Sequence, residues 1–222
     1  VKCFRCISVC PVKYCNKVGS DGISVNEALC IGCGNCIKIC THHAREFDSG
    51  LSDIFNDEKI PEKSVFIIDI DLLGKYKSSY KKVIAFLKNN GIGMVRNLDE
   101  GISILNANYN NYLSSSDNKI VISSDCASTV AYIELYKSAF IQNLIPFDSS
   151  HIHLVKKVIK EDESLADSKF YILTNCIEKK LEFARYNYDA ISVNGDEFIR
   201  YLERAGLDKM TETAEFDGTP HN

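Results

Sequence analysis

The sequence predicts two folded units: a small, cysteine-rich α+β module, followed by an α/β domain with a mainly parallel sheet flanked by helices. Three observations support this division. Eight of the 10 cysteines fall between residues 3 and 40. A polar stretch with Pro61 follows, and beyond residue 64 buried-strand runs alternate with helical patterns. We therefore assign 1–45 to the module, 46–63 to a linker that can include a short helix, 64–210 to the α/β domain and 211–222 to a polar tail.

The order of elements in the α/β domain follows from hydrophobic patterns and turn signals. Strands are expected at 65–70, 94–95, 119–124, 170–174 and 190–193. Helices are expected at 80–87 and 102–109, from 127 to 140, up to 161, and after an N-cap at Asn194. Strands that alternate with helices require crossover connections, and these favour parallel strands with helices on both faces of the sheet.

Two of these expected strands lead directly into a cysteine, namely Cys126 and Cys176. In parallel sheets the chemistry lies at the carboxyl ends of the strands. We therefore expect the two cysteines to lie at the same edge of the sheet. The alternative is that both are simply small buried residues, since free cysteine is often buried.

Composition and charge exclude some classes of partner. The net charge is −4 and basic residues form no run, which argues against a nucleic-acid partner. No apolar stretch approaches the ~20 residues needed to cross a bilayer, and no signal peptide precedes Cys3. We therefore expect a cytoplasmic protein with no membrane contact. The chain starts at Val1 rather than Met, so both ends are expected to be incomplete.

The strongest motif is a C-x2-C-x2-C-x3-C run formed by Cys30, Cys33, Cys36 and Cys40. Short gaps of this kind let one tight loop place thiolates on the irons of a [4Fe–4S] cluster, and the fourth cysteine ligates the other cluster of a two-cluster protein. Glycine at positions 32 and 34 fits a backbone that must come close to the cluster. The motif predicts an iron–sulfur module rather than a zinc site.

A second, shorter run contains Cys3, Cys6 and Cys10. The same spacing would place one more cysteine immediately before Val1, and we expect the intact polypeptide to have it. The exchange of fourth ligands then assigns two clusters. Cluster I is held by the upstream cysteine with Cys3, Cys6 and Cys40. Cluster II is held by Cys10, Cys30, Cys33 and Cys36.

Cys15 leaves an alternative open. It could be the fourth ligand of cluster I in a chain that truly begins at Val1. It could instead pack in the small core under the clusters, which we favour. With no fourth thiolate, cluster I would be a three-iron cluster or would have an open iron.

The histidines are weaker candidates. His42 and His43 follow Cys40 and could tune the potential of a cluster, but solvated loop positions are the simpler interpretation. His151 and His153 alternate along the chain, a spacing that does not place both on one face of a helix. We interpret them as ordinary polar residues.

Several motifs in fixed order resemble one family. They are CPVK at 10–13, CIGCGNCIKICTHHAR at 30–45, ISSDCASTVAYIELY at 122–136, TNCIEKK at 174–180 and DAISVNGDEF at 189–198. Together they resemble the iron-only hydrogenases, in particular a sensory-like branch in which a two-cluster ferredoxin precedes the catalytic-type domain. The resemblance extends from Cys3 to about Phe216. It implies that the α/β domain is the first lobe of a hydrogenase-like domain.

The same resemblance implies a further metal site. Cys126 and Cys176 match the cysteines that bind the cubane half of the active-site H-cluster, and Lys179 matches a lysine that contacts a cyanide ligand of the diiron half. Asp125 stands where catalytic members often have a proton-relay cysteine. The family's third motif contributes two more cysteines, yet this sequence has none after Cys176. Ala127 and Asn175 also replace the prolines usual at those positions.

These observations lead to three functional hypotheses. The first is one-electron transfer through two [4Fe–4S] clusters, with a redox partner protein and an anoxic environment. The second is a hydrogen-converting or hydrogen-sensing enzyme, in which sequence beyond residue 222 completes a site at Cys126 and Cys176, with Lys179 and Asp125 in the roles given above. The third is a scaffold that receives or passes on a cluster without redox turnover. A third cysteine motif downstream would favour the enzyme.

Overall fold

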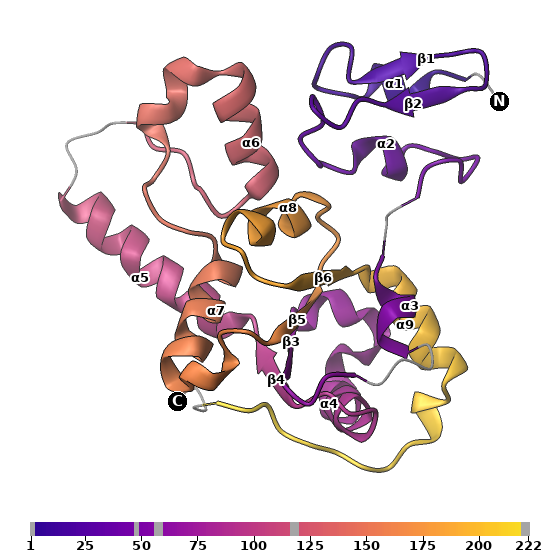
Figure 1. Ribbon diagram of the computed structural model, residues 1–222, viewed down its shortest axis with the longest axis vertical. Helices are drawn as coiled ribbons and strands as arrows, with labels where there is room; N and C mark the ends of the chain where they lie inside the picture. Colours follow the sequence, from indigo (N-terminus) through magenta and orange to yellow (C-terminus); the bar gives the residue numbers. More distant parts are fainter. Residues whose placement is uncertain (1–2, 47–48, 56–59, 116–119, 219–222) are drawn as a thin grey trace.

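The structure is a computed structural model that describes residues 3–46, 49–55, 60–115 and 120–218. In Figure 1 the N-terminal module lies beside the helices α6 and α8 of a larger α/β domain. Among the described helices, none is long and apolar enough to cross a bilayer.

The module consists of two similar halves. Each half contains one helical turn, α1 (Arg5–Ser8) or α2 (Asn35–Lys38), and each turn is preceded by a residue in the left-handed region. These residues are Phe4 with φ 60° and Gly34 with φ 71°. A short antiparallel hairpin lies between the halves, with strand β1 (Asn16–Val18) paired to β2 (Ile23–Val25).

The larger domain is built on a four-stranded sheet in which every pairing is parallel. The strands are β3 (Ser64–Ile68), β4 (Met94–Asn97), β5 (Lys169–Leu173) and β6 (Ala190–Val193), in the order β4-β3-β5-β6. All five residues of β3 are buried, as expected for a central strand covered on both faces. The predicted parallel sheet is therefore confirmed.

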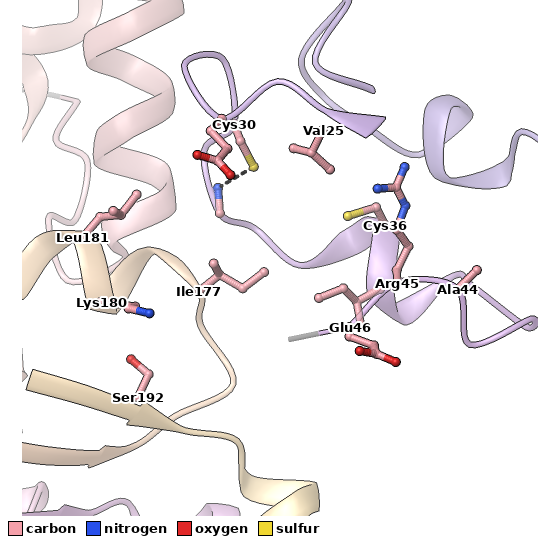
Figure 2. A pocket seen from close by; sticks show the side chains of 13 residues that line it. Val25, Cys30, Cys36, Ala44, Arg45, Glu46, Ile177, Lys180, Leu181 and Ser192 are labelled. Atoms are coloured by element: carbon pink, nitrogen blue, oxygen red, sulfur yellow. Dashed lines mark hydrogen bonds between the residues drawn. The ribbon is translucent and has the colours of Figure 1, made fainter. Parts of the chain in front are cut away.

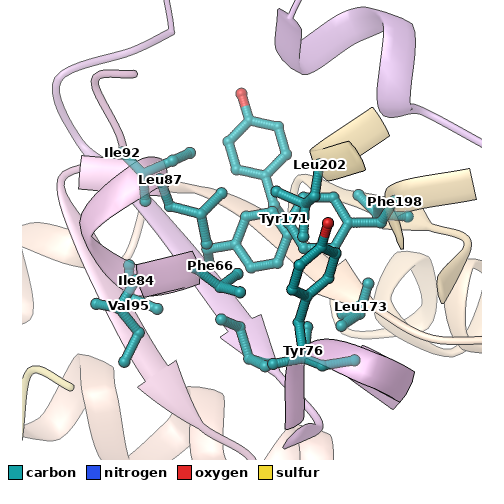
Figure 3. Close-up of a cluster of buried hydrophobic side chains, with 14 of the residues drawn as sticks. Phe66, Tyr76, Ile84, Leu87, Ile92, Val95, Tyr171, Leu173, Phe198 and Leu202 are labelled. Atoms are coloured by element: carbon teal, nitrogen blue, oxygen red, sulfur yellow. The ribbon is translucent and has the colours of Figure 1, made fainter. Parts of the chain in front are cut away.

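One face of the sheet is covered by α4 (Tyr80–Asn89), α9 (Gly195–Arg204), a 3₁₀ segment η1 (Ile70–Ser79) and a short helix α3 (Leu51–Phe55). Figure 3 shows Phe66 and Tyr171 from the sheet packed with Leu87 and Phe198 from these helices. The rings of Phe66 and Phe198 are stacked with centroids 5.6 Å apart. Alternate residues of each strand thus supply this core.

The opposite face packs against α7 (Ser150–Glu161) and α8 (Glu178–Arg185). Val65 and Ile67 of β3 meet Val155 of α7 and Phe183 of α8 in this second core. A long helix, α5 (Asp99–Ser115), packs on α7.

Local sequence signals explain the ends of two predicted helices. The side chain of Asn194 accepts a hydrogen bond from the Glu197 amide and caps α9, as predicted. Helix α4 ends at Asn89, next to Asn90 and Gly91, and Gly91 has φ 93°. Segment η1 is not among the predicted elements, and it is kinked at Gly74, which has φ 54°.

The strand expected at 119–124 is wrong. Within its described part, the backbone forms only an isolated parallel bridge between Ile122 and Leu144. Ile120 is 68% exposed and Val121 and Ile122 are half-buried, and this run is not part of the four-stranded sheet. The helix expected to reach 140 ends earlier: α6 spans Ala127–Tyr136, and the 3₁₀ segment η2 (Ser138–Asn143) follows.

The segments expected to be a linker and a tail both contact the α/β domain. Ile54 of α3 is buried in the core beneath α9. At the other end, the ring of Phe216 stacks on Tyr80, and the Asp217 amide donates to the Val95 carbonyl at the edge strand β4. These contacts cover an edge that would otherwise present unpaired backbone groups.

Candidate functional site

The three cysteines of this chain assigned to cluster I lie together. Cys3, Cys6 and Cys40 line one cavity of about 250 Å³, with Arg45 at its wall. The Ala44 amide donates to Cys40 Sγ over 3.3 Å. Backbone amides, first that of Ala44 and then that of His42, lower the pKa of Cys40 and favour its thiolate. This donor set fits an iron–sulfur cluster.

The cysteines assigned to cluster II lie closer to the α/β domain. Cys10, Cys30 and Cys33 pack against a small core that includes Ala131 of α6. Burial raises the pKa of Cys36, the charge of Arg45 opposes this rise, and the charges of Cys30 and Cys33 add to it. The Gly32 amide donates to Cys30 Sγ over 3.4 Å, as cluster-binding loops require.

The arrangement of these cysteines differs from that of a site for a single metal ion. Within the described residues, no group of three or more His, Cys, Asp or Glu side chains is arranged to hold one metal ion. The cysteines of a [4Fe–4S] cluster bind different irons, so their sulfurs do not converge on one point. The arrangement is thus compatible with clusters at both sites.

Cys15 is buried, with 2% of its surface exposed, and lies on the cluster II side of the module. Cys10 and Cys30 pack against the same small core as Cys15. Burial, and then the charges of Cys30 and Cys10, raise the pKa of Cys15 to about 12. Cys15 does not line the cavity of Cys3, Cys6 and Cys40, which favours the packing interpretation over a cluster I ligand.

An open cleft of about 590 Å³ separates the module from the α/β domain. Cys33 lines it from the module, Asp69 lines it from the end of β3, and Cys126 and Cys176 line it from the α/β domain. Cys126 and Cys176 thus line the same cleft, but only Cys176 follows a strand of the sheet. Cys126 is positioned as the N-cap residue of α6.

The environments of these two cysteines differ. Cys126 is exposed, whereas Cys176 is half-buried. The Cys176 amide donates to Thr174 Oγ1 over 3.1 Å, and Cys176 Sγ lies 3.8 Å from Ser128 Oγ. The two cysteines thus line the same cleft in unlike environments.

Asp125 and Lys179 have structural partners here. Asp125 accepts hydrogen bonds from the Ser150 amide and hydroxyl, both at 2.8 Å, and so caps α7 rather than the helix that follows it in sequence. Lys179 is buried and its ammonium donates to Glu182 Oε2 over 2.9 Å and to the Asp125 carbonyl oxygen over 3.2 Å. As far as the described residues define the cleft, Lys179 does not line it. The implied roles of both residues stay predictions.

The interpretation of His151 as an ordinary polar residue is wrong. His151 is buried, and neither ring nitrogen has a hydrogen-bond partner among the described residues. Burial, and then the nearby charge of Lys179, lower the pKa of His151 well below its usual value, so the ring is neutral. His153 is half-buried and its pKa is also lowered by burial. His42 and His43 are exposed, as expected for loop positions.

Sequence reasoning missed two residues at the junction of the module and the domain. Arg45 donates to Cys6 Sγ over 3.7 Å and also lines a second cavity, of about 510 Å³, with Cys30 and Cys36. Figure 2 shows Cys36 and Arg45 on one side of this cavity, opposite Ile177 and Leu181. Arg45 therefore lies between the two cysteine sets.

The second missed residue is Glu178, at the start of α8. Its backbone and side chain press against Gly32 so closely that a Cβ at position 32 would lie 2.7 Å from the Glu178 nitrogen. Glu178 is held by Arg185 at 2.8 Å. Only the fold brings this carboxylate to the cysteine loop, so no sequence signal could have identified the contact.

Comparisons with known proteins agree with the resemblance seen in the motifs. The model of the iron-only hydrogenase large subunit, C-terminal domain, matches residues 68–221, and that of the 4Fe-4S binding domain matches residues 23–46. A 44-residue segment is 52% identical to the B subunit of polysulfide reductase from Wolinella succinogenes, covering 19% of this chain and 22% of that protein.

Solved iron-only hydrogenases share the fold. An apo variant of [FeFe]-hydrogenase HydA1 from Chlamydomonas reinhardtii is 15% identical with a TM-score of 0.60, over 76% of this chain and 50% of that one. The [FeFe]-hydrogenase HydA(deltaEFG) is 16% identical with a TM-score of 0.56, over 76% and 49%. The chain thus spans about half the length of these hydrogenases. Taken with the family match over more than half of the sequence, the cysteine motifs and the parallel sheet show that this chain belongs to the iron-only hydrogenase family and is an iron–sulfur protein with a 4Fe-4S motif.

Proposed function

We propose that the chain transfers single electrons through two [4Fe–4S] clusters, between a redox partner protein and the cleft at Cys126 and Cys176. The observation that carries this proposal is the position of Cys33, which belongs to the cluster II set and also lines the cleft. The clusters, when bound, supply the one-electron chemistry. The chain's own side chains hold the clusters and determine their surroundings.

The positions of these side chains give the order of sites along the proposed electron path. Cys3 is exposed at the surface of the module, which suits exchange with a partner protein. The cluster II cysteines are covered by α6, where the Tyr136 hydroxyl donates to the Leu29 carbonyl oxygen over 2.8 Å and holds the helix against the module. Arg45 lies between the two sets and offers a positive charge to both. The proposed path therefore runs from cluster I through cluster II to the cleft.

The proposal is tested by iron and sulfide analysis of anaerobically prepared protein, together with EPR spectra after dithionite reduction. The parent and the double variant C126A/C176A are compared. About eight irons per chain in both proteins, with cubane-type signals, would support a two-cluster carrier whose cleft holds no metal. About four irons or fewer in the parent, or no cubane signal, would refute it.

A second candidate is hydrogen conversion or sensing, and the convergence of Cys126 and Cys176 on one cleft favours it. Those thiolates would hold the cubane part of the H-cluster, which supplies the hydrogen chemistry when bound. If the parent holds about 12 or more irons and C126A/C176A returns the count to about eight, the cleft is a metal site and hydrogen uptake must be assayed. A third cysteine motif in sequence downstream of residue 222 would support the same outcome.

A further inference from the structure

Five cysteines, not four, surround the site assigned to cluster II. The fifth is Cys15, which belongs to a small buried core against which Cys10, Cys30 and Cys33 pack. Cys15 is almost fully buried and packs with Val12 and Ile31 beneath α6. Nothing in the proposed electron path uses this thiol.

We propose that Cys15 is a reserve ligand of cluster II, which binds iron when Cys10 or Cys30 releases it. The exchange is balanced and involves no electron transfer. The bond between iron and the departing sulfur breaks, a bond from iron to Cys15 Sγ forms, and the proton of the Cys15 thiol passes to the departing thiolate. The inference rests on the proposed presence of cluster II.

The backbone holds Cys15 where such an exchange needs it. The Asn26 amide donates to the Cys15 carbonyl oxygen over 2.7 Å, and the Cys15 amide donates to that of Val12 over 3.4 Å. The Cys15 thiol also lies 3.8 Å from the Asn26 carbonyl oxygen. A thiol is a weak hydrogen-bond donor, so leaving this contact costs little.

The other half of the module has no such reserve. Cys10 and Cys40 occupy matching positions, and the residue five places further on is Cys15 in one half and Arg45 in the other. A guanidinium donates hydrogen bonds but does not ligate iron. When Cys40 is removed, no other cysteine should replace it as a ligand. When Cys10 is removed, Cys15 should bind the iron in its place.

This contrast provides the experiment. Iron and sulfide per chain and the EPR spectra of oxidised and reduced protein are measured, under anaerobic conditions, for five variants of the full chain: C15A, C10A, C10A/C15A, C40A and C40A/C15A. Far-UV circular dichroism of each variant checks its fold. We expect C15A and C10A to keep the iron content of the parent, with altered g-values in C10A. We expect C10A/C15A to lose at least about one further iron per chain and, when oxidised, to show a three-iron signal larger than that of the parent.

The matched pair C40A and C40A/C15A should be equal in iron content, because Cys15 does not face that site. Equal losses in C10A and C10A/C15A would overturn the reserve role, and so would a loss caused by C15A in the C40A background. If C10A does not fold, the pair C30A and C30A/C15A gives the same comparison. A parent protein without cubane signals would instead refute the proposed function, so the two failures are distinguishable.

Discussion

The two halves of the iron–sulfur module have similar backbones and unlike surroundings. Each has a left-handed residue followed by one helical turn, at Phe4 in the first half and at Gly34 in the second. In one half, Arg45 lines the cavity of Cys3, Cys6 and Cys40. In the other half, α6 covers Cys10, Cys30 and Cys33, which pack beside the neutral thiol of Cys15. One repeated motif can thus build two different redox environments, because the neighbouring α/β domain covers only one of them.

The largest expected effect comes from disrupting the contact between the cysteine loop at Gly32 and helix α8. Gly32→Ala places a methyl group 2.7 Å from the Glu178 nitrogen, at a residue with φ 62°. The left-handed conformation costs about 1–2 kcal/mol for alanine, and overpacking adds about 1–3 kcal/mol. We expect this combined cost to lower the midpoint of thermal unfolding by roughly 4–20 °C and part of the iron to be lost.

Gly34→Ala is the matched control, because Gly34 has φ 71° but no atom lies within 4 Å of its added Cβ. It should lower the unfolding midpoint by only about 2–8 °C and leave the iron content intact. Equal destabilisation by the two substitutions would mean that the contact between Gly32 and α8 contributes nothing.

A smaller effect should follow from removing the charge between the sites. Arg45→Gln takes away a cation that lies near both Cys6 and Cys36. A positive charge stabilises the reduced, more negative cluster, so the reduction potentials of both clusters should become more negative. Anaerobic redox titration followed by EPR measures the two shifts.

Arg5→Gln is the control for Arg45→Gln, because it removes a charge beside one cysteine set only. Arg5 is exposed, lines only the cavity of Cys3, Cys6 and Cys40 among the cavities described above, and donates to Thr41 Oγ1 over 3.4 Å. The potential of one cluster should fall slightly while the other stays constant. A shift of both clusters by Arg5→Gln, or of neither by Arg45→Gln, would contradict the placement of Arg45 between them.

The smallest effect concerns the strained residue of the first half. Phe4 has φ 60°, a conformation that costs a non-glycine residue about 1–2 kcal/mol. Phe4→Gly removes this strain but gives the unfolded chain more freedom, worth about 0.5–1 kcal/mol. The unfolding midpoint should therefore rise by about 1–2 °C. A fall of several degrees would show that the half-exposed ring packs usefully against its surroundings.

Much of the fold could be predicted from the sequence, since β3, β5, α4 and the cap of α9 are encoded in local patterns. The expected strand before Cys126 failed because an apolar run does not reveal whether a sheet edge is available to it. Cys126 and Cys176 nevertheless line one cleft, although the strand expected before Cys126, on which that expectation rested, does not form.

The asymmetry of the module could not be predicted. It depends on which half meets α6 and α8, and that is a matter of tertiary packing between distant segments, such as Leu29 with Tyr136 and Gly32 with Glu178. The positions of Cys15 and Arg45 are plain in the sequence, but their roles appear only once the domain is in place. The cap formed by Asp125 and the burial of His151 were hidden for the same reason.

An EPR-monitored redox titration of the anaerobic parent protein tests the two-cluster path most directly. We predict two one-electron steps at different potentials, with spectra that split through magnetic coupling when both clusters are reduced. A single step with one uncoupled cubane signal would contradict the claim that this chain carries electrons through two clusters in unlike environments.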